Sequence, residues 1–98
     1  MDLDNGYLYF SKNGTFQNSG VPTSGATGTG GIAITTAVTY GIYSEDFNYT
    51  QNAKAEGNFG SPPYSANSYT DGAGFGNFSY AVPSGYYSLN TKNLANFG

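Results

Sequence analysis

Residues 2–14 read DLDNGYLYFSKNG, and residues 15–17 continue as TFQ. Asp4-Asn5-Gly6 and Lys12-Asn13-Gly14 are turn signals, because Asn tolerates and Gly freely adopts the positive φ that tight hairpin turns need. The segment between them, Tyr7–Phe10, consists of aromatic and aliphatic residues that favour strands. The stretch therefore predicts a β-hairpin in which residues 7–10 form one strand and residues 15–17 return.

The next part of the chain alternates between loop and strand signals. Residues 18–31 contain mainly Gly, Ser, Thr and Pro and are expected to form a surface loop. Residues 32–43 are β-branched and aromatic, which predicts one or two buried strands. Residues 48–56 are polar and are expected to form a turn with a short strand. Pro62 and Pro63 end any strand ladder, because proline has no backbone N–H.

The last third repeats this pattern. Residues 71–76, DGAGFG, predict a Gly-rich turn. Residues 77–82 alternate so that Phe78, Tyr80 and Val82 share one face of a strand. Residues 83–85 are a second turn, and residues 86–94 predict a final short strand with one helical turn.

Short strands at this spacing, separated by Gly and Pro turns, predict an all-β fold: an antiparallel β-sandwich of the jelly-roll or concanavalin-like kind. The fold is expected to be incomplete on its own. Fifteen glycines raise the entropy cost of ordering the chain, and burial of its 17% aromatic residues does no more than offset that cost. We therefore expect the chain to pack against further polypeptide or against neighbours in an assembly.

Composition limits the chemistry. The 98 residues include no His, no Cys and no Arg, and the formal net charge is −3. The commonest acid–base, thiol and soft-metal chemistries need His or Cys, and nucleic-acid binding needs a basic surface. No run of 18 apolar residues occurs, so no membrane-spanning segment is expected. We expect no enzymatic activity, no cofactor, no nucleic-acid partner and no membrane insertion.

Three motifs suggest chemistry and are better explained by turns or by chance. Asp2, Asp4 and Asn5 resemble the start of a calcium loop, but the spacing of an EF-hand is absent. Glu45 and Asp46 are adjacent carboxylates, yet in a strand they would point to opposite faces. Gly72–Gly76 precedes no helix, so it is not expected to bind phosphate.

Two blocks of the sequence resemble the second half of SPRY-type (concanavalin-like) domains. The family's hairpin block is matched by residues 2–14, and its strand ending in Asn-Phe-Gly followed by Pro and an aromatic residue is matched by residues 58–64, NFGSPPY. Residues 40–43, YGIY, correspond to an intervening segment in which the family has proline where this chain has Gly41. The matching motif residues are Asp4, Asn5, Gly6, Asn13, Gly14, Asn58, Phe59 and Gly60.

The resemblance implies a domain division and a setting. Residues 1–64 would form the second half of a SPRY-like β-sandwich, and residues 65–98 a C-terminal extension with one or two further strands. The family's earlier strands would precede Asp2, so the chain would be a fragment, the ordered part of something larger, or a short protein that borrows strands from a partner. Residues 80–94, YAVPSGYYSLNTKNL, look like the extension that follows such domains in bacteriophage structural and tail-associated proteins.

The function predicted is therefore that of a virion structural segment: part of a phage fibre, tail-associated or capsid-decorating protein that acts by assembly with other virion proteins or copies of itself. The alternative is a lectin-like module that recognises a carbohydrate or protein, for example on a host surface. Aromatic residues beside turns are the candidate contacts for either role, with packing against neighbouring subunits favoured: Tyr64, Tyr69, Phe75, Tyr86 and Tyr87.

Overall fold

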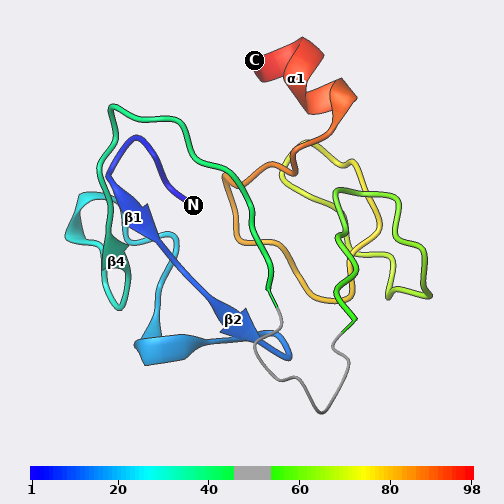
Figure 1. Ribbon diagram of the computed structural model, residues 1–98, viewed down its shortest axis with the longest axis horizontal. Coiled ribbons are helices and arrows are strands. Elements are labelled where there is room, and N and C mark those ends of the chain that lie inside the picture. Colours follow the sequence, from blue (N-terminus) through cyan, green and yellow to red (C-terminus); the bar gives the residue numbers. More distant parts are fainter. Residues whose placement is uncertain (46–53) are drawn as a thin grey trace.

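The computed structural model describes residues 1–45 and 54–98. Within these ranges the regular elements are short, and Figure 1 shows them joined by long stretches without helix or strand. In chain order they are β1 (Tyr7–Leu8), β2 (Ser11–Lys12), β3 (Thr15–Phe16), the 3₁₀ turns η1 (Gln17–Ser19) and η2 (Gly25–Thr27), β4 (Ile32–Ala33) and α1 (Thr91–Phe97).

The turn of the predicted hairpin is confirmed at Asn13-Gly14, but the strand that pairs with residues 15–16 is β2, not residues 7–10. β2 pairs antiparallel with β3, with Ser11 opposite Phe16 and Lys12 opposite Thr15. Asn13 and Gly14 both have positive φ, 50° and 79°, as a tight two-residue hairpin turn requires. The backbone of the turn residues therefore determines this part of the fold locally.

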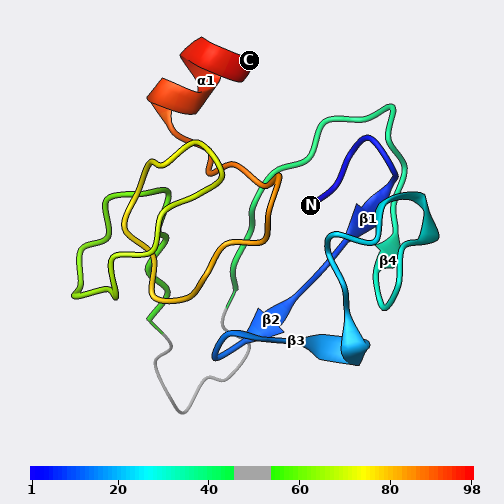
Figure 2. The same cartoon turned by 180° about the vertical axis from the view of Figure 1, so that it is seen from behind.

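The first two residues of the predicted strand at residues 7–10 pair elsewhere. β1 pairs with β4, with Tyr7 opposite Ala33 and Leu8 opposite Ile32, so the two-stranded sheet joins residues far apart in the sequence. The turn at residues 4–6 is confirmed by hydrogen bonds from the Gly6 and Tyr7 N–H groups to the Asp2 carbonyl, at 3.0 and 2.9 Å. Figure 2 shows the N-terminal segment beside β1 from the rear.

The predicted surface loop at residues 18–31 is an ordered loop held by its own backbone. The Val21 N–H donates to the Thr29 carbonyl at 2.9 Å, and the Thr29 N–H donates to Ser24 Oγ at 2.9 Å. The loop closes over the ring of Tyr7 at Gly28, whose φ is 62°. It therefore packs against β1.

The prediction of a β-sandwich is wrong. The described residues form two separate two-stranded sheets rather than two packed sheets. The predicted buried strand at residues 32–43 is reduced to β4, and every residue from Thr35 to Glu45 is exposed. The strand propensity of this segment is real, but a strand forms only where a partner backbone is present, and none of the other described residues supplies one.

The C-terminal third also departs from the prediction. Residues 77–82 form a single bridge, Phe78 to Tyr69, instead of a strand, and no strand forms in residues 86–90. The predicted helical turn is present as the seven-residue helix α1. The Asn90 side chain caps α1 by accepting a hydrogen bond from the Asn93 N–H at 2.8 Å, as expected of an Asn at this position.

The described residues contain no apolar core. No Ala, Val, Ile, Leu, Met, Phe or Tyr among them is buried, and the buried polar residues are Asp71 and Asn93, at 6% and 5% exposure. The Cα radius of gyration is 14.7 Å, against about 13 Å for a compact domain of this size. Order in this chain therefore comes from turns and hydrogen bonds.

Two predictions fall partly outside the described residues. Most of the predicted turn and strand at residues 48–56 lies there, and so does Asp46, one of the two adjacent carboxylates. The described part, residues 54–56, forms neither helix nor strand, and Lys54 pairs with Glu56 at 2.6 Å on the surface. Within residues 1–45 and 54–98, no helix is long and apolar enough to cross a membrane.

The contact between Gly28 and Tyr7 gives the first test. A Cβ on Gly28 would overlap the Tyr7 ring, whereas a Cβ on Gly25, which also has positive φ, would meet no atom within 4 Å. We expect Gly25→Ala to lower the free energy of unfolding by about 1 kcal/mol, because alanine is disfavoured in a left-handed backbone. Gly28→Ala should lower it by about 1–3 kcal/mol more, because the added Cβ overpacks the contact with Tyr7. The Ile34 N–H donates to the Gly6 carbonyl, so its hydrogen exchange measures the free energy needed to open the structure around β1 and β4. Equal effects of the two variants would contradict this packing.

Candidate functional site

The carboxylate of Asp71 organises the C-terminal third of the chain. Its Oδ1 accepts hydrogen bonds from the Ala73 and Phe75 N–H groups, each at 3.0 Å. Its Oδ2 accepts from the Ser88 N–H at 3.0 Å, from Ser88 Oγ at 2.6 Å and from Asn93 Nδ2 at 2.6 Å. One buried carboxylate thus ties the Gly-rich turn, the following segment and α1 together.

The charge on Asp71 is held in place by these donors. Burial by itself raises the pKa of this carboxyl, but the hydrogen bonds from Ser88, Phe75 and Asn93 outweigh burial and hold the pKa well below its usual range. The carboxyl is therefore ionised at neutral pH, and its hydrogen bonds are of the stronger, charge-assisted kind.

Asn93 extends this network into α1. Its Nδ2 also donates to the Ser88 carbonyl at 2.9 Å, which fixes the orientation of the amide because the opposite orientation would place its oxygen against the Asp71 carboxylate. Asn93 Oδ1 is buried and has no hydrogen-bond partner. At the C-terminal end of α1, Phe97 stacks on Tyr87 with ring centroids 4.6 Å apart, which gives the helix a second point of attachment.

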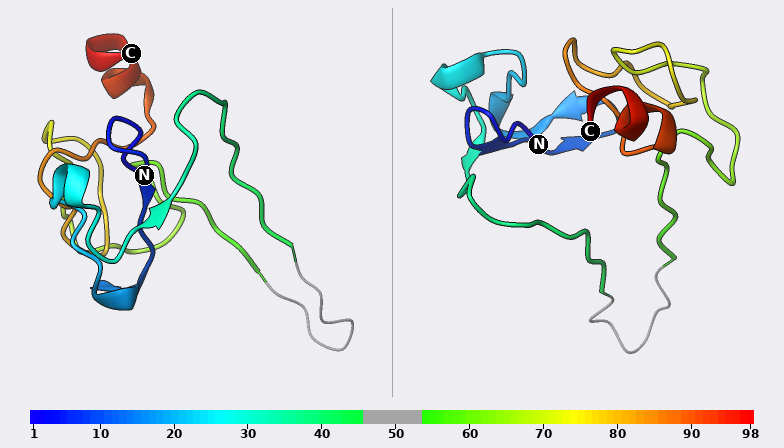
Figure 3. Two further views of the ribbon diagram at one scale, coloured as in Figure 1. Left: turned by 90° about the vertical axis from the view of Figure 1, so that its left-hand side faces the viewer. Right: turned by 90° about the horizontal axis from the view of Figure 1, so that it is seen from above.

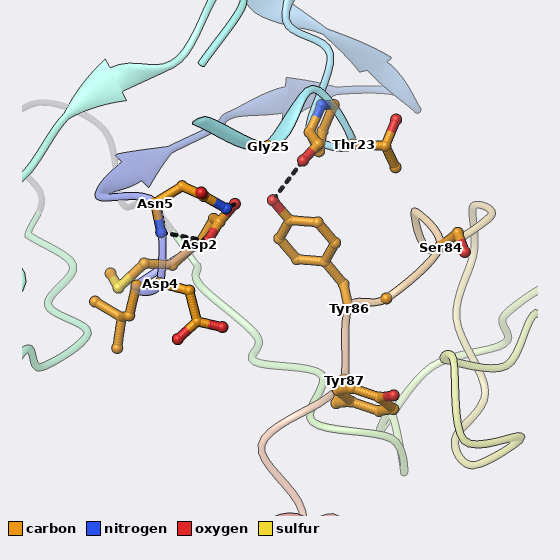
Figure 4. A pocket seen from close by; sticks show the side chains of 12 residues that line it. Asp2, Asp4, Asn5, Thr23, Gly25, Ser84, Tyr86 and Tyr87 are labelled. Atoms are coloured by element: carbon orange, nitrogen blue, oxygen red, sulfur yellow. Dashed lines mark hydrogen bonds between the residues drawn. The ribbon is translucent and has the colours of Figure 1, made fainter. Parts of the chain in front are cut away.

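The same network positions Tyr86 at a cavity. The Gly72 N–H donates to the Tyr86 carbonyl at 3.0 Å, and the Tyr86 hydroxyl donates to the Pro22 carbonyl at 2.8 Å, across 64 positions of sequence. Figure 4 shows the ring standing between the N-terminal turn and Ser84, with its hydroxyl directed at the loop that carries Thr23 and Gly25. Burial and the neighbouring Asp2 charge raise the pKa of Tyr86.

The cavity is open to solvent and has a volume of about 560 Å³. Its walls combine an aromatic ring with polar side chains from the N-terminal turn, namely Asp2, Asp4 and Asn5. The Asp2 carboxylate accepts from the Asn5 N–H at 3.0 Å and from Asn5 Nδ2 at 2.8 Å, and these hydrogen bonds lower the pKa of Asp2. Oxygen acceptors beside a ring face suit a ligand with hydroxyl groups and an apolar side.

The Asp2 side chain holds the N-terminal turn together. Asp2 stabilises the turn through Asn5, which agrees with the prediction that these residues serve the turn instead of a calcium loop. Across residues 1–45 and 54–98, no three His, Cys, Asp or Glu side chains come close enough to bind one ion together.

The structure separates the five predicted contact residues. Tyr86 and Tyr87 line the cavity, but Tyr64, Tyr69 and Phe75 do not. The Lys92 ammonium lies 5.0 Å from the centroid of the Phe75 ring. Tyr69 forms an antiparallel backbone bridge with Phe78.

The block at residues 58–60 has a local role. Asn58 Nδ2 donates to the Asn77 carbonyl at 2.9 Å, and Asn58 Oδ1 accepts from the Gly60 N–H at 2.8 Å. Phe59, between them, is 47% exposed. The block therefore attaches to residue 77 through its Asn, while its aromatic side chain is about half exposed.

Sequence reasoning missed the importance of Asp71, Ser88 and Asn93. The signal for Asp71 was present, since an Asp followed by Gly-x-Gly commonly caps its own turn through its side chain. Ser88 and Asn93 carried no comparable signal, because they reach Asp71 from 17 and 22 positions away.

No family model, no curated protein and no solved structure matches this chain. The resemblance of residues 2–14 and 58–64 to SPRY-type domains therefore stays a prediction, and the function is argued from the structure.

The low pKa of Asp71 gives the second test. Because its pKa in the folded chain lies below the unfolded value of about 3.9, its contribution to stability is complete above that pH and is lost as the pH falls through the folded pKa. Asp71→Asn should remove this acid dependence and cost about 2–4 kcal/mol at neutral pH, since an amide NH₂ would face N–H donors. Exchange of the Phe75 N–H between pH 5 and 2 measures both effects. The exposed Asp4→Asn is the matched control, and equal behaviour of the two variants would contradict the role of Asp71.

Proposed function

We propose that this chain is an assembly segment of a virion structural protein, which acts by packing against other virion proteins or copies of itself. The observation that carries the proposal is the exposure of its apolar residues. Among the described residues, seventeen large hydrophobic side chains are at least 40% exposed and none is buried. A soluble domain normally buries such residues, so this surface suits a chain whose packing is completed by other polypeptide.

Six of the exposed residues lie in two places. Leu3, Leu89, Leu94 and Phe97 line an apolar groove of about 710 Å³ along α1, with Leu89 75% exposed. Ile42 and Tyr43, at 77% and 79% exposure, lie on the segment that Figure 3 shows projecting away from the rest of the chain. No charged side chain of the described residues lines the groove, a composition typical of permanent interfaces. On the projecting segment, the Tyr43 hydroxyl donates to the Glu45 carboxylate at 2.8 Å, so one charge borders its apolar residues.

The virion setting rests on resemblance. Residues 2–14 and 58–64 are similar to SPRY-type blocks, and residues 80–94 are similar to an extension found in phage structural proteins. The uncharged polar surface, with only 9% charged residues, also favours a segment surrounded by other protein over one that remains soluble alone.

Particle fractionation tests this function. An antibody raised against the chain should detect it in the sedimenting particle fraction of a culture that produces it, and immuno-electron microscopy should place it on fibres, tails or capsid surface. An antibody against a soluble protein of the same cells is the control for trapping. A chain that is soluble, monomeric and absent from particles would rule the proposal out.

A second candidate function is carbohydrate recognition, which the cavity beside Tyr86 favours. The ring supplies an apolar face, and Asp2, Asp4 and Asn5 supply oxygen atoms that accept hydrogen bonds from sugar hydroxyls. This role is compatible with assembly, since a structural protein of a particle can also bind a host surface.

A glycan array tests this second candidate. Tyr86→Leu should weaken binding of any retained glycan about five- to tenfold, because an aromatic contact contributes roughly 1 kcal/mol beyond its area. Tyr64→Leu removes an exposed Tyr outside the cavity and should leave binding unchanged. Tyr86→Phe keeps the ring but loses the bond to the Pro22 carbonyl, so it separates stacking from positioning. Equal losses for Tyr86→Leu and Tyr64→Leu would argue against a site at this cavity.

A further inference from the structure

The segment that follows β4 has the sequence of a strand, but within residues 1–45 and 54–98 it has no pairing partner. Residues 39–45, TYGIYSE, run without a turn or bend, and all are exposed. No backbone N–H or C=O of these residues bonds to the backbone of another described residue. Figure 3 shows the segment projecting outward together with the returning stretch that begins at residue 54. We call residues 39–43 the arm.

The arm lacks the features that keep exposed strands from pairing. Natural edge strands carry Lys, Pro, bulges or inward charges that prevent edge-to-edge association. The sequence from Asn13 to Ser44 contains no charged residue, and the arm contains no proline. A β-branched and aromatic segment of this kind, left open, is a pairing site and an aggregation hazard. A partner strand would remove the hazard.

The geometry points to a second copy of this chain as that partner: we infer that the arm pairs antiparallel with the arm of another copy, with Gly41 opposite Gly41. The inference deepens the proposed assembly function and rests on it. It states which surface of the chain associates and with what.

Side-chain matching supports this register. With Gly41 on the two-fold axis, Tyr40 faces Ile42 on one side of the ribbon, and Thr39 faces Tyr43 on the other. Each aromatic side chain thus lies opposite a β-branched one, which is a favourable cross-strand pair. The axis itself has no side chain, so nothing obstructs the approach of the two backbones.

Charge selects the antiparallel direction. In the Gly41-centred register, Glu45 lies opposite the uncharged Ala37 of the other copy. In a parallel, in-register pairing, Glu45 would lie beside Glu45, which is unfavourable. A bend at residues 36–38 separates the arm from β4, so the new ribbon would form beside the sheet of β1 and β4 rather than as its extension. Because the arm is short, its contact area is below the roughly 1,600 Å² of a standard interface, and the dimer should dissociate on dilution.

Single-cysteine cross-linking tests the register, because the chain has no native cysteine. A Cβ on Gly41 would meet no atom within 4 Å, so Gly41→Cys fits the fold. In the inferred register the two cysteines face each other within disulfide reach. In the control, Thr39→Cys, they are four positions out of register, about 13 Å apart and beyond the reach of a disulfide. With oxidised glutathione, the covalent dimer should form about tenfold faster for Gly41→Cys than for Thr39→Cys.

Sedimentation equilibrium of the unaltered chain provides a readout that depends on no variant. We expect a mass that rises from monomer to dimer with concentration. Gly41→Lys should raise the dissociation constant about tenfold, because it places two like charges opposite each other, while Gly41→Ala leaves it within about twofold.

A chain that stays monomeric at all concentrations, or a Gly41→Cys variant that cross-links no faster than Thr39→Cys, overturns the inference. A different partner strand is then indicated if the chain is still found in particles, and the assembly function survives. If instead the chain forms a dimer with the inferred register but is absent from particles, the pairing is supported and the virion proposal is ruled out.

Discussion

The buried Asp71 carboxylate is the interaction on which the rest of the C-terminal structure depends. Five donors from four residues converge on its two oxygens, and they belong to the Gly-rich turn, to Ser88 and to α1. A buried charge without such donors would be strongly unfavourable, so the surrounding backbone must adopt the one arrangement that satisfies it. That requirement orders the turn, the segment carrying Tyr86 and Tyr87, and the helix without an apolar core beneath them.

How much of this structure could be predicted from the sequence depends on whether each feature is set by neighbouring residues or by residues far along the chain. Asn13-Gly14 set their own φ values, so the hairpin turn could be predicted locally. Strands need partners. Residues 32–43 have the composition of a buried strand, but beyond β4 no other described residues pair with them. The sandwich was therefore inferred from propensities that the described chain does not bring together.

The candidate site divides in the same way. Tyr86 and Tyr87 could be selected from sequence because aromatic residues beside Pro-Ser-Gly turns lie at the surface. Their neighbours could not be selected, because the cavity joins residues 2–5 to residues 84–87 through a fold that no local pattern encodes. The hydrogen bond from Tyr86 to the Pro22 carbonyl spans 64 positions, and the local sequence around neither residue predicts it.

The two apolar surfaces differ in how far folding has prepared them for a partner. The groove beside α1 is already fixed, since Asp71 holds Asn93, and Tyr87 stacks on Phe97. The backbone that carries the groove therefore loses little further freedom on association. The arm has no backbone hydrogen bonds to the other described residues, so the entropy cost of ordering it falls on the association step. A partner that binds the groove therefore contacts a preformed surface. Pairing of the arm couples folding to binding, so a full ladder of backbone hydrogen bonds is needed to offset the entropy cost of ordering it.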